Sequence, residues 1–227
     1  MAVVLINPNS TAAMTRTLLD AARAAEPGLT FDAWTSTDGP PAIQGPEDGE
    51  AATGPLLDLV RRADTRGADA VVIGCFDDTG LDAAARAAAC PVIGIGQAGF
   101  HMAALRGWRF SVVTTLAVSV PVIEANIAAY GLGGRLGRVR ASGVPVLAIE
   151  ADPHGAFDAI LAEARTALRE DGADAIVLGC AGMADLTARM RASLGAPVID
   201  PVEAAAGCAR WLTSRAGPVR GRAAAAG

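Results

Sequence analysis

Gly67-Ala68-Asp69-Ala70-Val71-Val72-Ile73-Gly74-Cys75 is repeated, almost unchanged, as Gly172-Ala173-Asp174-Ala175-Ile176-Val177-Leu178-Gly179-Cys180. Seven of the nine positions are identical, and the other two exchange one branched aliphatic residue for another. Each block is a short apolar run bounded by turn-forming residues, which predicts a buried strand. Each is followed by a helical stretch and then by a Pro-Val-Ile run. The offset of 105 residues (180 − 75) therefore indicates two copies of one unit.

Short apolar runs rich in Val and Ile alternate with longer Ala-rich stretches along the chain. This alternation is typical of β-α units and a parallel sheet. The candidate strands are residues 3–7, 30–34, 70–74 and 91–95 in the first half and residues 109–114, 144–149, 175–179 and 197–200 in the second. The predicted fold class is α/β: two pseudo-symmetric lobes, each with a parallel four-stranded sheet flanked by helices, and an active site in the cleft between them.

The repeat also sets the expected division of the chain. The first lobe covers residues 1–96 and the second covers residues 97–207. A last helix, residues 202–215, is expected to pack back across both lobes. Residues 208–227 are therefore the end of this helix and a tail that, from Gly217 on, is expected to fray.

Composition and charge exclude several classes of function. A net charge of −5 with scattered arginines argues against a nucleic-acid partner, which requires a clustered basic surface. The 227 residues are 52% hydrophobic, yet no apolar stretch reaches the roughly 20 residues that a membrane span needs. The first residues also lack the basic start of a signal peptide. We therefore expect a cytoplasmic protein with no membrane partner, whose four cysteines are thiols.

The residue types present argue against cofactors and metals. The sequence has no lysine, which a pyridoxal-phosphate enzyme needs for its Schiff base and a Walker loop needs for phosphates. No two cysteines have CxxC spacing, and His101 and His154 match no HExxH pattern, so no metal site is expected. The run from Gly94 to Gly99 is a literal GxGxxG, but the next strand ends in threonine rather than in an acid. Tight packing of a strand against a helix explains these glycines better than dinucleotide binding.

The two repeated cysteines lie where open parallel sheets bind ligands, beyond the carboxyl ends of strands. We expect each to stand at a helix N-terminus, where the helix dipole lowers a thiol pKa. If the lobes face each other, Cys75 and Cys180 approach one ligand from opposite sides. This geometry suits a proton transfer in which one thiolate removes a proton from a carbon and a thiol on the far face returns one. The prediction is a cofactor-independent racemase acting on a small molecule.

A thiolate is too weak a base unless the carbanion is delocalised onto a carbonyl whose oxygen accepts hydrogen bonds. The backbone N–H groups that follow the cysteines, at Phe76, Ala181 and Gly182, and the residues Thr114 and Thr115 are the candidate donors. Asn9 is a further candidate at the end of the first strand, although Asn9 and Thr115 could be plain helix caps. A single cysteine after a strand is more often a small apolar residue than a catalyst, and we assign Cys90 and Cys208 to that class.

Four motifs resemble the hydantoin racemases of the aspartate/glutamate/hydantoin racemase superfamily. They are Ile6-Asn7-Pro8-Asn9-Ser10, Gly74-Cys75-Phe76-Asp77-Asp78-Thr79-Gly80-Leu81, Phe110-Ser111-Val112-Val113-Thr114-Thr115 and Leu178-Gly179-Cys180-Ala181-Gly182-Met183. The resemblance implies a pseudo-symmetric fold, a homo-oligomer without cofactor or metal, and Cys75 and Cys180 as catalytic acid and base. It also implies a 5-substituted hydantoin as substrate, with allantoin as a variant.

The loop from Gly39 to Gly45 departs from the family's usual Gly-Pro-x-Ser-Ile-Glu-Gly by carrying Ala42 and Gln44. This change removes a hydroxyl and a charge from a loop expected to line the pocket and leaves Ile43 as an apolar contact. Two alternatives stay open. One is a superfamily isomerase or decarboxylase that acts on a dicarboxylate, and the other is a small-molecule binding module without catalysis.

Overall fold

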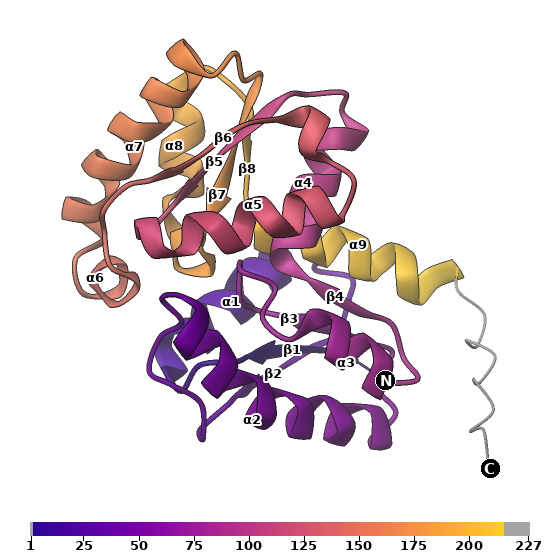
Figure 1. Ribbon diagram of the computed structural model, residues 1–227. Helices are drawn as coiled ribbons and strands as arrows, with labels where there is room; N and C mark the ends of the chain where they lie inside the picture. Colours follow the sequence, from indigo (N-terminus) through magenta and orange to yellow (C-terminus); the bar gives the residue numbers. More distant parts are fainter. Residues whose placement is uncertain (1, 216–227) are drawn as a thin grey trace.

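The computed structural model describes residues 2–215, and the tail from Gly217 on lies outside the described residues. Two four-stranded parallel sheets form two lobes, one below the other in Figure 1. The first sheet has the order β2-β1-β3-β4, and the second has the corresponding order β6-β5-β7-β8. The strands are β1 (Val3–Asn7), β2 (Phe31–Thr35), β3 (Ala70–Ile73), β4 (Val92–Gly94), β5 (Phe110–Thr114), β6 (Leu136–Ala141), β7 (Ala175–Gly179) and β8 (Val198–Ile199).

The duplication extends to the register of the strands. Ile6 of β1 pairs with Ile73 of β3, and Val113 of β5 pairs with Leu178 of β7. A Gly-Cys pair follows the inner strand of each sheet at the same edge. The predicted pair of similar four-stranded parallel sheets is thus confirmed.

Helices cover both faces of each sheet. They are α1 (Ala12–Ala25), α2 (Pro46–Thr65), α3 (Leu81–Ala87), α4 (Ile95–Leu105), α5 (Val120–Ala129), α6 (Val146–Ala151), α7 (Pro153–Glu170), α8 (Thr187–Leu194) and α9 (Pro201–Arg215), with short 3-10 helices η1 (Ala117–Ser119), η2 (Gly133–Arg135) and η3 (Ala181–Leu186). Buried residues alternate between the faces, as period-two strands require. In β1, for example, Val4 and Ile6 pack toward α2, whereas Val3 and Leu5 join a core shared with the second lobe.

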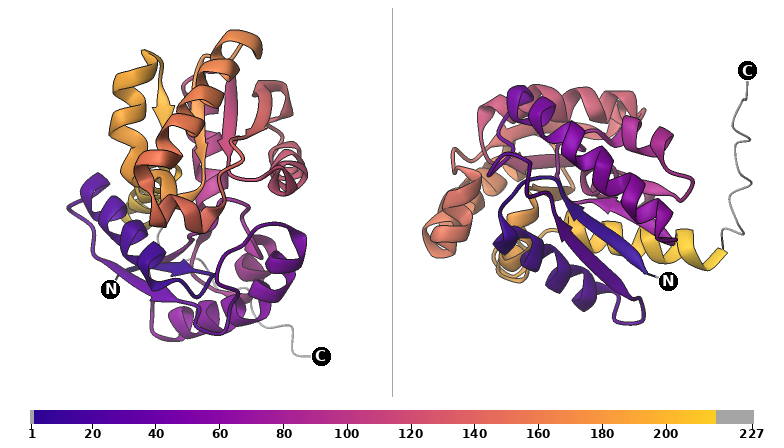
Figure 2. Two further views of the ribbon diagram at one scale, coloured as in Figure 1. Left: turned by 90° about the vertical axis from the view of Figure 1, so that its left-hand side faces the viewer. Right: turned by 90° about the horizontal axis from the view of Figure 1, so that it is seen from below.

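That shared core holds the lobes together. It contains Phe100 of α4, Phe110 of β5 and Ala205 of α9 beside Leu5 and Val72 of the first sheet. Helix α9 runs along the level between the lobes and contacts α1 and α4 (Figure 1). In the side view of Figure 2 the strands of one sheet run at a steep angle to those of the other. The two cysteine-bearing edges are therefore fixed relative to each other by apolar packing.

One predicted strand is wrong. Residues 144–149 were predicted to form a strand. The edge strand of the second sheet is instead β6 (Leu136–Ala141), and α6 begins at Val146. Gly143, at φ 77°, ends the extended segment, and Pro145 stands at the N-cap of α6. A short apolar run is compatible with either a buried strand or a helix, and Leu and Ala favour the helix here.

The boundaries at 96 and 207 fall inside α4 and α9, which each contact both sheets. The division into 1–96, 97–207 and 208–227 stays a proposal. Among residues 2–215 no helix has both the length and the apolar character needed to cross a bilayer.

Candidate active site

A small cavity lies where the two cysteine-bearing sheet edges meet. Its volume is about 40 Å³, which is room for very few water molecules. Residues from both halves of the chain line it: Asn9, Met14, Ile43, Gly74, Cys75, Phe76, Asp77, Thr114, Thr115, Ser119, Val146, Gly179, Cys180, Ala181 and Gly182. The structure thus brings together all nine of the predicted site residues, although their chemical roles are a separate matter. The carboxyl ends of β3, β5 and β7 supply most of the wall.

Sequence reasoning missed four side chains of this wall. Met14 comes from α1 and Val146 from α6, which had been expected to be a strand. Asp77 and Ser119 come from loops on opposite halves and are hydrogen-bonded to each other. Asp77 lies two residues after Cys75 in the motif from Gly74 to Leu81, so its place near the site could have been predicted from the sequence. No sequence feature pointed to Ser119.

The sulfur of Cys75 is held in a closed corner. The Thr79 hydroxyl donates to its Sγ at 3.4 Å, and α3 begins only at Leu81. Burial raises the pKa of the Cys75 thiol above its usual value, and the nearby Asp77 charge raises it further. The prediction of a lowered pKa is therefore wrong for this cysteine, because no helix N-terminus reaches the sulfur and the residues near it are acidic.

The loop after Cys75 is fastened by the second half of the chain. Ser119 donates to Asp77 Oδ2 at 3.3 Å, and Asn126 Nδ2 of α5 donates to the Asp77 carbonyl at 2.8 Å. Tyr130 at the end of α5 donates to Asp78 Oδ2 at 2.9 Å. Burial raises the pKa of Asp77 to about 6 and that of Asp78 to about 7. The Cys75 corner thus contains two carboxyl groups that are harder to ionise than usual.

Asp78 also explains the GxGxxG run. Its carboxylate accepts the N–H groups of Gly96 and Gln97 at 3.0 and 2.7 Å, at the N-terminus of α4. A Cβ at Gly94 would overlap the Asp78 carboxylate, and one at Gly96 would overlap the Phe76 carbonyl. These glycines therefore permit a close approach between the loop after Cys75 and the start of α4. Tight packing was predicted, but of a strand against a helix, whereas the close contacts of Gly94 and Gly96 are with a loop.

The Cys180 corner has a different continuation. Cys180 is the N-cap of η3, so helical backbone starts at the next residue. The sulfur lies near Gly182, where an added Cβ would be 3.8 Å from Sγ. Cys180 also packs against an apolar cluster of Met14, Ala42 and Val146. Ala181 and Gly182 thus follow this cysteine in the sequence, whereas Phe76 and Asp77 follow Cys75.

Two candidate polar residues have structural partners. The Thr114 hydroxyl donates to the Gly179 carbonyl at 3.0 Å, which ties β5 to β7. The Asn9 carboxamide accepts the Thr11 N–H at 2.9 Å and donates to the Met14 sulfur at 3.2 Å. Thr11 is the N-cap of α1, so Asn9 shapes the turn before the helix rather than capping it.

Two segments close over the cavity, one from each half. The loop before α2 contributes Gln44, whose Oε1 accepts the Val146 N–H of α6 at 3.0 Å. Ala42 of the same loop packs with Val146. A cavity this small is below the 300–1,000 Å³ of ordinary ligand pockets. Ligand entry therefore requires these two covering segments to separate.

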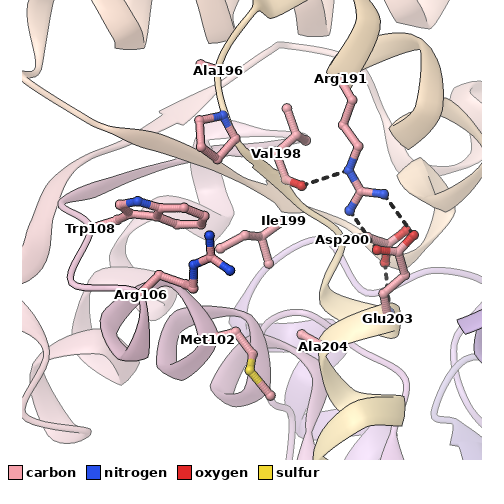
Figure 3. Close-up of a pocket in the computed structure, with 11 residues that line it drawn as sticks. Met102, Arg106, Trp108, Arg191, Ala196, Val198, Ile199, Asp200, Glu203 and Ala204 are labelled. Atoms are coloured by element: carbon pink, nitrogen blue, oxygen red, sulfur yellow. Dashed lines mark hydrogen bonds and ion pairs between the residues drawn. The ribbon is translucent and has the colours of Figure 1, made fainter. Parts of the chain in front are cut away.

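A larger groove, about 490 Å³ in volume, lies away from the cysteines (Figure 3). Arg191 forms an ion pair with Glu203 on one side of it, and Arg106 stacks over the Trp108 ring on the other. None of the predicted site residues lines this groove. Among the described residues, no group of three or more His, Cys, Asp or Glu side chains is arranged to hold a metal ion.

The fold and the cavity define the class of this protein: a duplicated two-lobed α/β protein with a candidate site at the strand ends of both sheets. Residues 3–209 match the family model described as Asp/Glu/Hydantoin racemase, so the chain belongs to that family. It is a racemase, an isomerase acting on a small molecule.

Relatives cover almost the whole chain. The hydantoin racemase of Rhizobium meliloti is 46% identical over 213 residues, which is 93% of this chain and 88% of that protein. The hydantoin racemase of Paenarthrobacter aurescens is 37% identical, covering 94% of this chain and 92% of its own length. The allantoin racemase of Pseudomonas fluorescens superposes with a TM-score of 0.89 at 37% identity, covering 93% of this chain and 90% of that one.

Proposed function

We propose that this enzyme interconverts the enantiomers of 5-substituted hydantoins by moving a proton between C5 and the two cysteines, Cys75 and Cys180. The observation that carries the proposal is that both repeated cysteines line one cavity, between two halves of the same fold. The relatives named as hydantoin racemases, 37–46% identical over most of the chain, support the substrate class.

The proton inventory of such a reaction balances without a cofactor. In one direction the Cys180 thiolate takes the C5 proton, and the electron pair moves onto the adjacent carbonyl oxygen of the ring. The Cys75 thiol then gives its proton to the opposite face of C5 and becomes the thiolate. The raised pKa of Cys75 supports its role as the proton donor in the resting enzyme. The reverse reaction exchanges the two roles.

The developing oxyanion needs hydrogen-bond donors. The candidates are the backbone N–H groups of Phe76, Ala181 and Gly182, all of which line the cavity. Thr115 also lines it, and no hydrogen bond of its hydroxyl to another described residue is seen. Thr114 is a weaker candidate because its hydroxyl already donates to Gly179. One such donor is typically worth about 3 kcal/mol in the transition state.

The lining favours a neutral substrate. Among the residues that line the cavity there is no Arg, Lys or His, and Asp77 adds a negative charge when ionised. A dicarboxylate would enter without a counter-charge, which disfavours the dicarboxylate alternative. A hydantoin ring is neutral and carries its C5 proton next to a carbonyl. Ile43 lines the cavity from the loop before α2, which supports a contact between its side chain and the 5-substituent.

Allantoin is the second candidate substrate. It is itself a 5-substituted hydantoin, and two allantoin racemases superpose on this chain with TM-scores of 0.87 and 0.89 at 36% and 37% identity. The apolar Met14, Ile43 and Val146 around Cys180 favour an apolar 5-substituent over the ureido group of allantoin. A glutamate racemase and an arylmalonate decarboxylase, at 15% and 20% identity, share the fold only.

Isotope exchange tests the proposal directly. One enantiomer of an apolar 5-substituted hydantoin is incubated with the enzyme in D2O, with allantoin and an aryl malonate as parallel substrates. We expect loss of optical rotation together with deuterium at C5, faster for the hydantoin than for allantoin. Exchange no faster than in buffer alone for every hydantoin would contradict the proposal, and binding without exchange would favour a non-catalytic binder.

We also propose that the enzyme works in the cytoplasm as a homo-oligomer and binds neither nucleic acid nor membranes. Trp211 and Leu105, 67% and 78% exposed, flank an apolar groove between α4 and α9 that supports self-association. The net charge of −5 supports the absence of a nucleic-acid partner. Sedimentation of the full chain at several concentrations measures the oligomeric state.

A further inference from the structure

Asp77 is the one carboxylic acid among the residues that line the cavity. The Ser119 hydroxyl reaches its Oδ2 at 3.3 Å, which is a long hydrogen bond for two oxygens. Among the described residues no other side chain or N–H group donates to this carboxylate. Among the residues that the structure describes, none is seen to donate to the second oxygen, Oδ1, of this half-buried residue, which lines the same cavity as Cys75 and Cys180.

The position of Asp77 is fixed from the opposite lobe. Asn126 of α5 donates to its carbonyl at 2.8 Å, and Ser119 precedes the same helix. The neighbouring Asp78 is anchored by Tyr130 and by the N-terminus of α4. A carboxylate that is held through its main chain, and whose second oxygen accepts from no described residue, is arranged to accept from a ligand.

We propose that Asp77 accepts a hydrogen bond from a ring N–H group of the substrate and so selects cyclic ureides over substrates that present a carboxylate. This inference rests on the proposed function, because it assigns the recognition of the same ring at the same cavity. A hydantoin ring carries N–H groups at N1 and N3, each beside a carbonyl, and N1 is bonded to the reacting carbon.

The selection follows from charge. An N–H group that approaches the carboxylate gains a charge-assisted hydrogen bond, which is stronger than a neutral one. A substrate carboxylate at the same place would meet a like charge in a site without a compensating cation. Asp77 would therefore both orient the ring between Cys75 and Cys180 and exclude amino acids and diacids.

Methylated substrates test this interaction. The rate constant kcat/KM is measured for a 5-substituted hydantoin and for its N1-methyl and N3-methyl derivatives, with the wild-type enzyme, Asp77→Ala and Asp77→Asn. For the wild type we expect one of the two methyl groups to lower kcat/KM about 10- to 100-fold, the range of a lost hydrogen bond to a charged group. In Asp77→Ala the unmethylated substrate is poorer and the methylation penalty falls below about threefold.

The Asn variant and a matched control make the result specific. Asp77→Asn keeps nearly the same shape and one acceptor oxygen but no charge, so its methylation penalty should lie between those of the wild type and Asp77→Ala. Asp82→Asn removes the same charge from an exposed residue at the start of α3 and should keep the full wild-type penalty. A thermal unfolding measurement shows whether Asp77→Ala still folds. If it does not, the methylation penalty of Asp77→Asn tests the role of Asp77.

The outcomes separate this inference from the proposed function. A wild-type enzyme that racemises all three hydantoins equally well, or a penalty that stays unchanged in both Asp77 variants, overturns the role of Asp77 and leaves the racemase intact. A wild-type enzyme that racemises no hydantoin overturns the proposed function and the inference with it.

Discussion

The corners at Cys75 and Cys180 have nearly the same sequence up to the sulfur and different surroundings beyond it. After Cys75 the chain makes a loop with two acids, the half-buried Asp77 and the buried Asp78, and α3 starts six residues later at Leu81. After Cys180 helical backbone starts at once with Ala181, and Gly182 leaves space beside the sulfur. The duplicated strands thus supply matching positions, while the residues that follow give each thiol its own environment.

This difference fits the division of labour in a racemase. A proton donor and a proton acceptor must face the same carbon. Two identical environments would give both thiols the same tendency to hold a proton. The acids beside Cys75 favour its protonated form, because a thiolate there would be buried next to negative charge. No acid occupies the two positions after Cys180. If the two cysteines act as proposed, the acids that follow Cys75 favour it as the proton donor of the pair.

The largest expected effect comes from removing either sulfur. Cys75→Ser and Cys180→Ser should each lower the racemisation of a 5-substituted hydantoin by about 10²- to 10⁴-fold, the usual contribution of a positioned acid or base. Polarimetry measures the loss, and NMR in D2O follows C5 deuteration of each enantiomer. Each variant should still exchange the C5 proton of one enantiomer only, and not the same one.

Cys208→Ser is the matched control, because Cys208 lies in α9 and does not line the cavity. It should racemise at the wild-type rate. Full activity in either cavity variant, or equal loss in Cys208→Ser, would contradict the assignment of the two thiols.

The glycines before the two sulfurs should differ in their tolerance of a side chain. A Cβ at Gly179 would lie 2.7 Å from Thr114 Cα and 2.8 Å from the Val113 carbonyl, both of which are backbone. A Cβ at Gly74 would meet mainly the end of the Leu18 side chain, which can rotate. Gly179→Ala should therefore cost about 2–3 kcal/mol of unfolding free energy and Gly74→Ala about 1 kcal/mol. Urea unfolding of both variants measures this order, and the reverse order would show that the two corners are packed differently.

The acids after Cys75 should make stability depend on pH. Their pKa values in the folded protein, about 6 for Asp77 and about 7 for Asp78, lie above that of an unfolded aspartic acid. The stabilisation from each is complete below about pH 4 and is lost as the pH rises through 6 to 7. The unfolding free energy should fall between pH 5 and 8 by on the order of 1 kcal/mol for each group.

Asp77→Asn should remove one part of the decrease in unfolding free energy with pH. Asp82→Asn, at an exposed position, should leave this decrease unchanged. Chemical unfolding at several pH values measures both. A wild-type stability that rises across this interval would show that the hydrogen bonds to Ser119, Tyr130 and α4 outweigh the burial of these acids.

The smallest expected effect concerns the two segments that close over the cavity, the loop before α2 and helix α6. Gln44→Ala removes the acceptor for the Val146 N–H and should make the separation of the two segments easier by about 1 kcal/mol, lowering KM about fivefold. Gln44→Glu keeps an acceptor oxygen at the same place and should return KM most of the way to the wild-type value. Steady-state kinetics with one hydantoin compares the two variants, and equal KM values for both would mean that this bond does not hold the cover.

The repeat from Gly67 to Cys75 was sufficient to predict two matching parallel sheets, because strand propensity and pattern are local properties that the same sequence expresses twice. It also placed both cysteines at strand ends. It was not sufficient for residues 144–149, where a short apolar run fits a strand or a helix and only Gly143 and Pro145 decide between them.

The sequence by itself determined the duplicated α/β fold and the matching positions of Cys75 and Cys180. The tertiary structure decided the electrostatics. Asp78 became a buried weak acid and Asp77 a half-buried one, because α4 and α5 pack against the loop that follows Cys75. Burial contributes most to the raised pKa of the Cys75 thiol, and a local sequence pattern does not show it. The acids that raise this pKa further, Asp77 and Asp78, are close neighbours of Cys75 in the sequence.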